Sequence, residues 1–159
     1  MIKMEDLDLS GFFTTNVEAA DFLTRISAIS EDIYRTDFDL EKALIEQLGI
    51  RKKDKFAILL RDNKISQGSN PALKDFFDKI REKISSMPVI SLTLAFEPGE
   101  ETLKILSDWF PLNINRQVLL DIKVDIDLIA GAYISFNGKY SDSSVRPIFD
   151  RTYKEISAV

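Results

Sequence analysis

The period of the hydrophobic pattern changes near Pro88, and this change limits the folds open to the chain. Before Pro88, apolar residues recur every three to four positions, which is typical of amphipathic helices. From Ile90 to Phe96 every second residue is apolar, which is typical of a strand with one buried face. The sequence therefore predicts an α+β protein, with a helical bundle in residues 1–86 and a small mixed-sheet domain in residues 87–159.

Helix-capping patterns divide the first region into four predicted helices. Residues 15–18 (Thr-Asn-Val-Glu) match a capping box, so a helix should begin there. Asp37 or Asp39 can cap a second helix, and Gly49 suits the left-handed position that commonly ends one. A third apolar group follows, and residues 70–71 (Asn-Pro) open a fourth helix. The predicted inward-facing residues include Phe22, Leu23, Ile26, Ile29, Leu44, Phe56, Ile58, Leu60, Leu73, Phe76 and Phe77.

The second region reads as β-α-β-β-α. After the first strand, a helical stripe should stop near Pro111. Apolar residues then alternate with polar ones from Val118 to Ile126, predicting a strand whose outer face is acidic. A further strand leads to residues 137–138 (Asn-Gly), a pair that favours a two-residue hairpin turn. A last helix is expected from about residue 142, with Val145, Ile148, Phe149, Tyr153 and Ile156 facing inward.

The composition removes several classes of function. The chain has neither histidine nor cysteine, so the commonest general base, thiolate nucleophiles and thiolate metal sites are excluded. A net charge of −5 argues against nucleic-acid binding. No apolar stretch approaches the ~18 residues that a membrane span needs. We therefore expect any membrane association to go through another protein.

Three aspartates leave an alternative open. Asp121, Asp125 and Asp127 alternate along one predicted strand and could bind Mg²⁺ as part of a small carboxylate enzyme. The simpler interpretations are a solvated strand face partly balanced by Lys123, and a local structural role for Asp125.

Three adjacent aromatic pairs, at residues 12–13, 76–77 and 109–110, are candidate contact points. On a helix, neighbouring residues point in different directions, so at most one ring of each pair is expected to face the core fully. The second ring would then be available to a partner, although packing in the core remains an alternative.

The segment Val124-Asp125-Ile126-Asp127-Leu128-Ile129-Ala130-Gly131, followed by Asn137-Gly138 and Asp142-Ser143-Ser144-Val145-Arg146, resembles the carboxyl-terminal signature of the F-type ATP synthase delta subunit. This family includes the mitochondrial oligomycin-sensitivity-conferring protein. By this resemblance, seven residues have a structural role in the signature: Asp125, Leu128, Ile129, Gly131, Gly138, Asp142 and Ser144.

The resemblance covers residues 88–156 well and extends weakly upstream through residues 56–64. Ala130 and Pro147 depart from the family pattern, and alanine fits only where the backbone avoids positive φ. The amino-terminal lobe of the family is a six-helix bundle, whereas only residues 1–86 precede the sheet here. The sequence is thus similar to a divergent member with a shortened helical domain.

The resemblance implies a non-catalytic stator subunit without a cofactor, on the cytoplasmic face of a bacterial membrane and monomeric when isolated. The helical domain would bind the amino termini of the alpha subunits, and the sheet domain would bind a b-type stalk subunit. A stalk subunit of another rotary ATPase, such as a vacuolar-type E subunit, would need a long charged amino-terminal helix that this sequence lacks. The candidate interface residues are Phe22, Leu23, Ile26, Ile29, Phe56 and Leu60 on the helices, each of which can instead be core, and Arg146 and Arg151 on the last helix.

Overall fold

The computed structural model describes residues 7–66, 68–114, 116–128 and 130–143, with only the backbone described at 111, 113 and 114. Among these residues, those at 7–13 and 17–87 form one compact unit, and those at 14–16 and 88–143 form the other.

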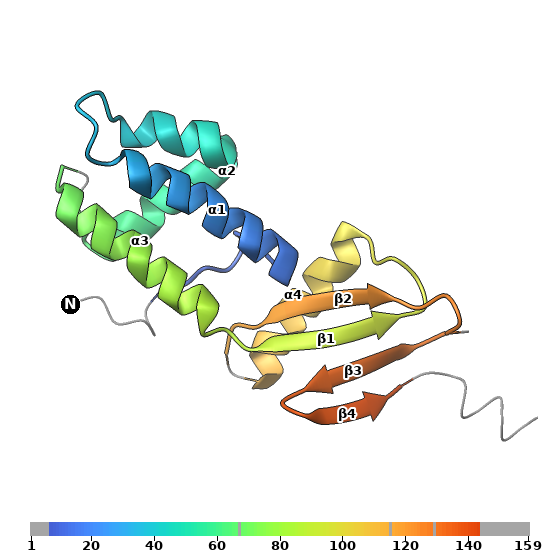
Figure 1. Cartoon of the computed structure of the whole chain (residues 1–159). Coiled ribbons are helices and arrows are strands. Elements are labelled where there is room, and N and C mark those ends of the chain that lie inside the picture. The colour runs from blue at the N-terminus through green and yellow to red at the C-terminus, as the bar shows by residue number, and fades with distance from the viewer. Residues whose placement is uncertain (1–6, 67, 115, 129, 144–159) are drawn as a thin grey trace, which may run out of the picture. The chain divides into compact units, whose positions relative to one another are not determined.

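Three helices build the first unit: α1 (Asn16–Asp32), α2 (Leu40–Asp62) and α3 (Asn70–Ser85) (Figure 1). Asp39 caps α2, because its side chain accepts a hydrogen bond from the backbone N–H of Lys42 at 3.1 Å. Ser69 is the N-cap of α3, one residue earlier than expected, and Pro71 lies in the first turn as predicted.

Gly49 bends α2 without ending it. Its backbone has φ 77° and ψ 165°, a conformation that is essentially restricted to glycine. The sequence predicted that a helix ends at Gly49 and that the apolar group around Phe56 forms a separate segment. The helical conformation is interrupted at Gly49 as predicted, and Phe56 lies in the segment that follows. The backbone is helical on both sides of Gly49, so the two segments form one kinked helix.

An aromatic cluster fills the core of the helical unit. The ring of Phe56 is fully buried and has its centroid 6.2 Å from Phe12, 5.9 Å from Phe76 and 5.7 Å from Phe77. Phe12 in turn lies 5.2 Å from Phe22. Phe76 and Phe77 are both completely buried, as their place among the predicted inward-facing residues required, so the expectation that at most one ring of an adjacent pair faces the core fully is wrong for this pair. Phe56 of α2 supplies part of the cover, because its ring contacts both of them.

The second unit is a mixed four-stranded sheet with one described helix. Its elements are β1 (Val89–Leu94), α4 (Glu100–Ile114), β2 (Leu119–Val124), β3 (Ala132–Phe136) and β4 (Lys139–Asp142). The strand order is β2-β1-β3-β4, with β1 parallel to β2 and the other two pairs antiparallel. The predicted α+β class and mixed sheet are therefore confirmed. The expected last helix lies outside the described residues.

The α4 side of the sheet carries the core of this unit. Ile90 and Leu92 from β1, Leu120 from β2 and Phe110 from α4 are buried together. Figure 1 shows α4 behind the sheet, crossing behind β1 and β2. The alternation predicted for β1 is thus the one observed, with every second residue pointing toward α4.

A short segment before α1 adds to the edge of the sheet. Thr15 forms a parallel bridge with Leu120, whose backbone N–H donates to the carbonyl oxygen of Thr14 at 3.1 Å. The side-chain amide of Asn16 donates to Asp121 at 3.1 Å. The outer edge of β2 is therefore partly covered by residues far away in the sequence.

Two element boundaries differ from the sequence expectation. The helix α4 continues past Pro111 to Ile114, since a proline in the last turn removes only one backbone hydrogen bond. The strand β2 ends at Val124, where its pairing with Leu94 of β1 also ends. Ile126, expected to face inward, consequently lies beyond the strand and is 87% exposed.

The aromatic cluster predicts a large asymmetry between two residues of α2. Phe56→Ala should lower the free energy of unfolding of the helical unit by about 3–5 kcal/mol, because it leaves a cavity among the rings of Phe12, Phe76 and Phe77. Ile58→Ala, at a half-exposed position on the same helix, should cost less than about 1 kcal/mol. Urea denaturation followed by circular dichroism at 222 nm would measure both. Equal losses would contradict the assignment of Phe56 as the centre of this core.

Candidate functional site

Five of the six interface residues expected on the helices are core residues. Phe22, Ile26, Ile29, Phe56 and Leu60 are each no more than 1% exposed. Packing in the core was the alternative left open by the sequence, and it holds for these five residues. Leu23 is the exception, since it remains partly exposed. Arg146 and Arg151 lie outside the described residues.

Leu23 lines an open groove between α1 and α3. The groove has a volume of about 600 Å³, and short side chains make up most of its lining. From α1 it receives Leu23, Thr24, Ser27, Ala28 and Glu31, and from α3 it receives Arg81 and Ser85. Because most of these side chains are short, a partner helix could approach the backbone closely along this surface. The hydrophobic period does not single out these positions, so the sequence analysis missed all of them except Leu23.

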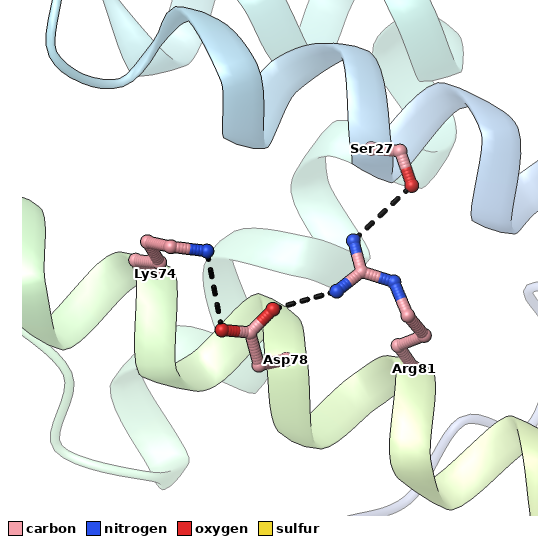
Figure 2. Close-up of polar contacts among 4 residues, drawn as sticks. All are labelled: Ser27, Lys74, Asp78 and Arg81. Carbon is pink, nitrogen blue, oxygen red and sulfur yellow. Dashed lines mark hydrogen bonds and ion pairs between the residues drawn. The ribbon is translucent and has the colours of Figure 1, made fainter.

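A chain of polar contacts joins the two helices beside the groove (Figure 2). The Arg81 guanidinium donates to Ser27 Oγ of α1 at 3.2 Å and to Asp78 Oδ1 at 2.6 Å. Lys74 Nζ donates to the other carboxylate oxygen of Asp78 at 3.3 Å. Arg81 is thus held in position by both helices, with part of its side chain available to the groove.

The charge state of Asp78 is set by these neighbours. Burial works against ionisation, but hydrogen bonds from Lys74 and Arg81 outweigh it and hold the pKa of Asp78 below its ordinary value. Asp78 is therefore a charged acceptor that fixes Arg81 at neutral pH.

The three aspartates of the sheet unit do not converge on one point. Asp121 accepts hydrogen bonds from the Asn16 amide at 3.1 Å and from Ser91 Oγ at 3.2 Å, and Lys123 Nζ lies 3.6 Å away. These contacts connect β1, β2 and the start of α1. Within the described part of the chain, no three acidic residues are arranged to hold a metal ion.

Asp125 shapes a turn at the end of β2. Its Oδ1 accepts from the backbone N–H of Asp127 at 3.0 Å, and its carbonyl oxygen accepts from the N–H of Leu128 at 3.1 Å. Its own N–H donates to Leu94 of β1 at 2.9 Å. The carboxylate therefore holds the turn in place, and Leu128 is buried behind it.

The glycines of the signature occupy backbone positions that other residues rarely adopt. Gly131 has φ 97° before β3, and Gly138 has φ 73° in the two-residue turn to β4. Asn137 shares this turn with φ 50°, so the predicted hairpin is confirmed. Asp142 pairs with Tyr133 across β3 and β4. Ile129 and Ser144, also part of the signature, lie outside the described residues.

Comparison with known proteins shows which family the chain belongs to. Residues 16–155 match the model of the ATP synthase delta (OSCP) subunit. The chain belongs to this family. The resemblance inferred from the sequence is thereby confirmed, and the match reaches further upstream than residues 56–64, to residue 16.

Relatives named ATP synthase subunit delta are modestly similar. The protein of Fervidobacterium nodosum is 35% identical over 92 residues, which are 58% of this chain and 50% of that protein. For Pseudothermotoga lettingae the identity is 31% over 75 residues, or 47% and 41% of the two chains. For Thermosipho melanesiensis it is 28% over 101 residues, or 64% and 56%. The matched part thus spans about half the length of these delta subunits.

None of the helices within the described residues combines the length and the apolar character needed to cross a bilayer.

The first prediction from this site concerns acid stability. Because the folded pKa of Asp78 is lowered, its carboxylate stabilises the fold above the unfolded-state pKa of about 4, and this contribution is lost as the pH falls through the folded pKa. Asp78→Asn should cost less than about 1 kcal/mol at about pH 7, and this cost should shrink as the pH falls below about 4. A double-mutant cycle with Arg81→Gln, followed by urea denaturation, would measure the coupling. A coupling that stayed constant with pH would argue against this ion pair.

The second prediction separates a structural aspartate from an exposed one. Asp121→Ala should destabilise the sheet unit by about 1–3 kcal/mol, because the Asn16 amide and the Ser91 hydroxyl both lose their acceptor. Asp127→Ala, at an exposed position whose backbone makes the turn contact, should change stability by no more than about 0.5 kcal/mol. Urea denaturation of the two variants provides the measurement.

Magnesium tests the enzyme alternative directly. We expect MgCl₂ to leave the melting temperature of the unmodified protein unchanged, since the carboxylates are engaged in separate contacts. A magnesium-dependent rise that disappears in Asp125→Ala would instead support a metal site.

Proposed function

We propose that this chain is a non-catalytic peripheral-stalk subunit of a rotary proton-translocating ATP synthase. In this role it links the catalytic head to a membrane-anchored b-type stalk during ATP synthesis. The observation that carries the proposal is the family match over residues 16–155. The engaged aspartates and the lack of histidine and cysteine agree with a subunit that binds partners and performs no chemistry.

The physical task of such a subunit is to resist torque. The rotor would turn the catalytic head with it unless the head were tied to the membrane, and the energy of rotation would then be lost as slippage. A connector of this kind needs a firm surface for each partner, in contrast to an enzyme that needs a reactive centre. Two compact units with separate cores provide such surfaces. The subunit would work at the cytoplasmic face of the membrane, held there by its partners.

We assign the alpha-subunit amino termini to the groove between α1 and α3. Leu23 and Ala28 offer apolar contact, and Thr24, Ser27 and Ser85 offer short side chains between which an amphipathic helix can lie. Glu31 and Arg81 provide one acidic and one basic group near the groove, which would favour one orientation of the bound helix. The b-type stalk is assigned to the sheet unit, with Arg146 and Arg151 of the following segment as candidate contacts.

The groove can be tested with a peptide that copies the amino terminus of the cognate alpha subunit. Ala28→Trp places a large ring in the groove and should weaken peptide binding at least about ten-fold, which corresponds to ~1.4 kcal/mol. Glu82→Trp, on the exposed side of α3 and outside the groove, should bind as the unmodified protein does. Isothermal titration calorimetry with all three proteins gives the affinities, and circular dichroism checks that the variants fold.

The result can overturn the assignment in two ways. If the unmodified protein releases no heat with the peptide at high micromolar concentration, the alpha subunit is not the partner of this unit. If both tryptophan variants bind equally well, the peptide binds elsewhere. Co-purification of the native protein with alpha, beta and b-type subunits would test the wider stalk role independently of the groove.

A further inference from the structure

The chain contains a single Asn-Gly pair, at residues 137–138, and the fold places it at the turn between β3 and β4. Both residues are exposed. The ladder of the hairpin ends with Phe136 opposite Lys139, so the N–H of Gly138 takes no part in the pairing of the strands. A β-carbon built on Gly138 would meet no heavy atom of the described residues within 4 Å. Solvent therefore reaches the backbone that joins the pair.

This exposure brings together two groups that can react with each other. Once hydroxide has removed its proton, the backbone nitrogen of Gly138 can attack the side-chain carbonyl carbon of Asn137. The new N–Cγ bond closes an imide ring, and the Cγ–Nδ2 bond breaks as ammonia leaves with a proton from water. Water then opens the ring at either carbonyl, which gives aspartate or isoaspartate. The net reaction is a hydrolysis of the amide, so water and hydroxide are the only reagents it needs.

The other asparagines of the chain each lack one of the conditions for this attack. Asn70 is followed by a proline, which has no N–H to lose. The side chain of Asn16 donates to Asp121 at 3.1 Å, and the next residue is a valine, whose branched side chain hinders ring closure. Asn113 and Asn115 are followed by isoleucine and arginine, which also crowd the attacking nitrogen.

Asn63 offers the sharpest contrast, because it also follows directly on an element, α2. Its side-chain amide donates to the carbonyl oxygen of Leu59 at 2.8 Å. The next backbone nitrogen, that of Lys64, donates to the carbonyl oxygen of Arg61 at 2.9 Å. At Asn63, therefore, both the group that would be attacked and the group that would attack are held in hydrogen bonds.

The folded turn restrains the reaction at Asn137. This residue has φ 50° and Gly138 has φ 73°, so the hairpin fixes the link between them in one conformation. Ring closure needs that link to rotate, and the hairpin must open first. Among the described strands β4 is at the edge of the sheet, and its four residues are all exposed, so opening uncovers little buried surface. The rings of Tyr133 and Tyr140, with centroids 5.5 Å apart, oppose the opening.

The two products differ in their effect on the hairpin. In isoaspartate the main chain runs through the former side chain, which adds a methylene group to the turn between Phe136 and Lys139. Turn type and loop length fix the register of a hairpin, so the pairing of β4 with β3 would be weakened or shifted. Aspartate adds a negative charge but keeps the turn, since Asp-Gly favours the same turn type. Damage to the fold is therefore expected from the isoaspartyl product.

We propose that Asn137 is a site of spontaneous deamidation, where the Gly138 nitrogen displaces the side-chain amide and isoaspartate accumulates in the turn between β3 and β4. Opening of the hairpin controls the rate. The turn is then the position at which the sheet unit is chemically altered as the protein ages. This inference concerns the chain alone and is independent of the proposed stalk function.

Ageing of the full chain in mildly alkaline buffer tests the site. Samples taken at successive times are digested and analysed by mass spectrometry. Deamidation at Asn137 should be at least about ten-fold faster than at Asn63, where two hydrogen bonds must break first. A protein isoaspartyl methyltransferase should label the peptide that contains Asn137. An unmodified Asn137 peptide, equal rates at the two asparagines, or deamidation without isoaspartate would each overturn the proposal.

Tyr140→Ser tests whether opening of the hairpin controls the rate. Loss of the ring contact with Tyr133 should raise the rate at Asn137 about two- to five-fold and leave the rate at Asn63 unchanged. An unchanged rate at Asn137 would show that the reaction proceeds in the closed turn and would contradict this control.

Two substitutions at Asn137 separate the effect of the backbone from that of the charge. Asn137→Gly removes the reactive amide and keeps a Gly-Gly pair suited to the turn, whereas Asn137→Asp introduces the charge without the added methylene group. The melting temperature of the unmodified protein should fall on ageing, and that of Asn137→Gly should not. Freshly prepared Asn137→Asp should melt as the fresh unmodified protein does. An equal fall in aged Asn137→Gly would mean that the damage arises at another position.

Discussion

The pairing of β1 with two neighbours at once is the constraint on which the sheet unit depends. β1 is hydrogen-bonded to β2 in parallel and to β3 in antiparallel. Among the described strands, only β1 has a neighbour of each kind. A parallel neighbour requires a crossover, and that crossover is α4. Ile90 and Leu92 make one face of β1 apolar. The crossover helix α4 must pack on that face, where Phe110 completes the core. The alternating pattern of one short strand therefore determines where the helix lies.

The helical unit depends on the concentration of its large apolar side chains around Phe56. Phe56 contacts rings from the segment before α1 and from α3, so the most apolar positions of the unit meet in one place. This leaves mainly small and polar side chains between the outer parts of α1 and α3. Under the proposed function, a helix bound in this groove would meet serine, threonine and alanine with a single leucine, and shape would contribute more to recognition than buried apolar area. Arg81, fixed by Asp78 and Ser27, adds a charge of defined position.

Periodicity was sufficient to predict the fold class and most elements, but it failed where tertiary contacts decide. The capping residue Asp39 and the Asn137-Gly138 hairpin were predictable because their effects are local. The end of β2 was not, since it depends on where β1 stops offering hydrogen bonds. The expectation that only one ring of an adjacent pair faces the core fully also failed for Phe76 and Phe77, because Phe56 from a distant part of the sequence packs against both. For the same reason, strong apolar periodicity indicated core residues such as Phe22 and Ile26, and gave little information about the surface groove.

The residues through which the family resemblance was recognised explain why it survives at modest identity. Gly131 and Gly138 adopt positive φ, and Asp125 closes a turn with its side chain, so each meets a requirement of the backbone itself. Apolar core residues can exchange with one another as long as volume and pattern persist. The turn positions of the sheet unit therefore tolerate fewer side chains than its apolar core positions, such as Ile90 and Leu92, do.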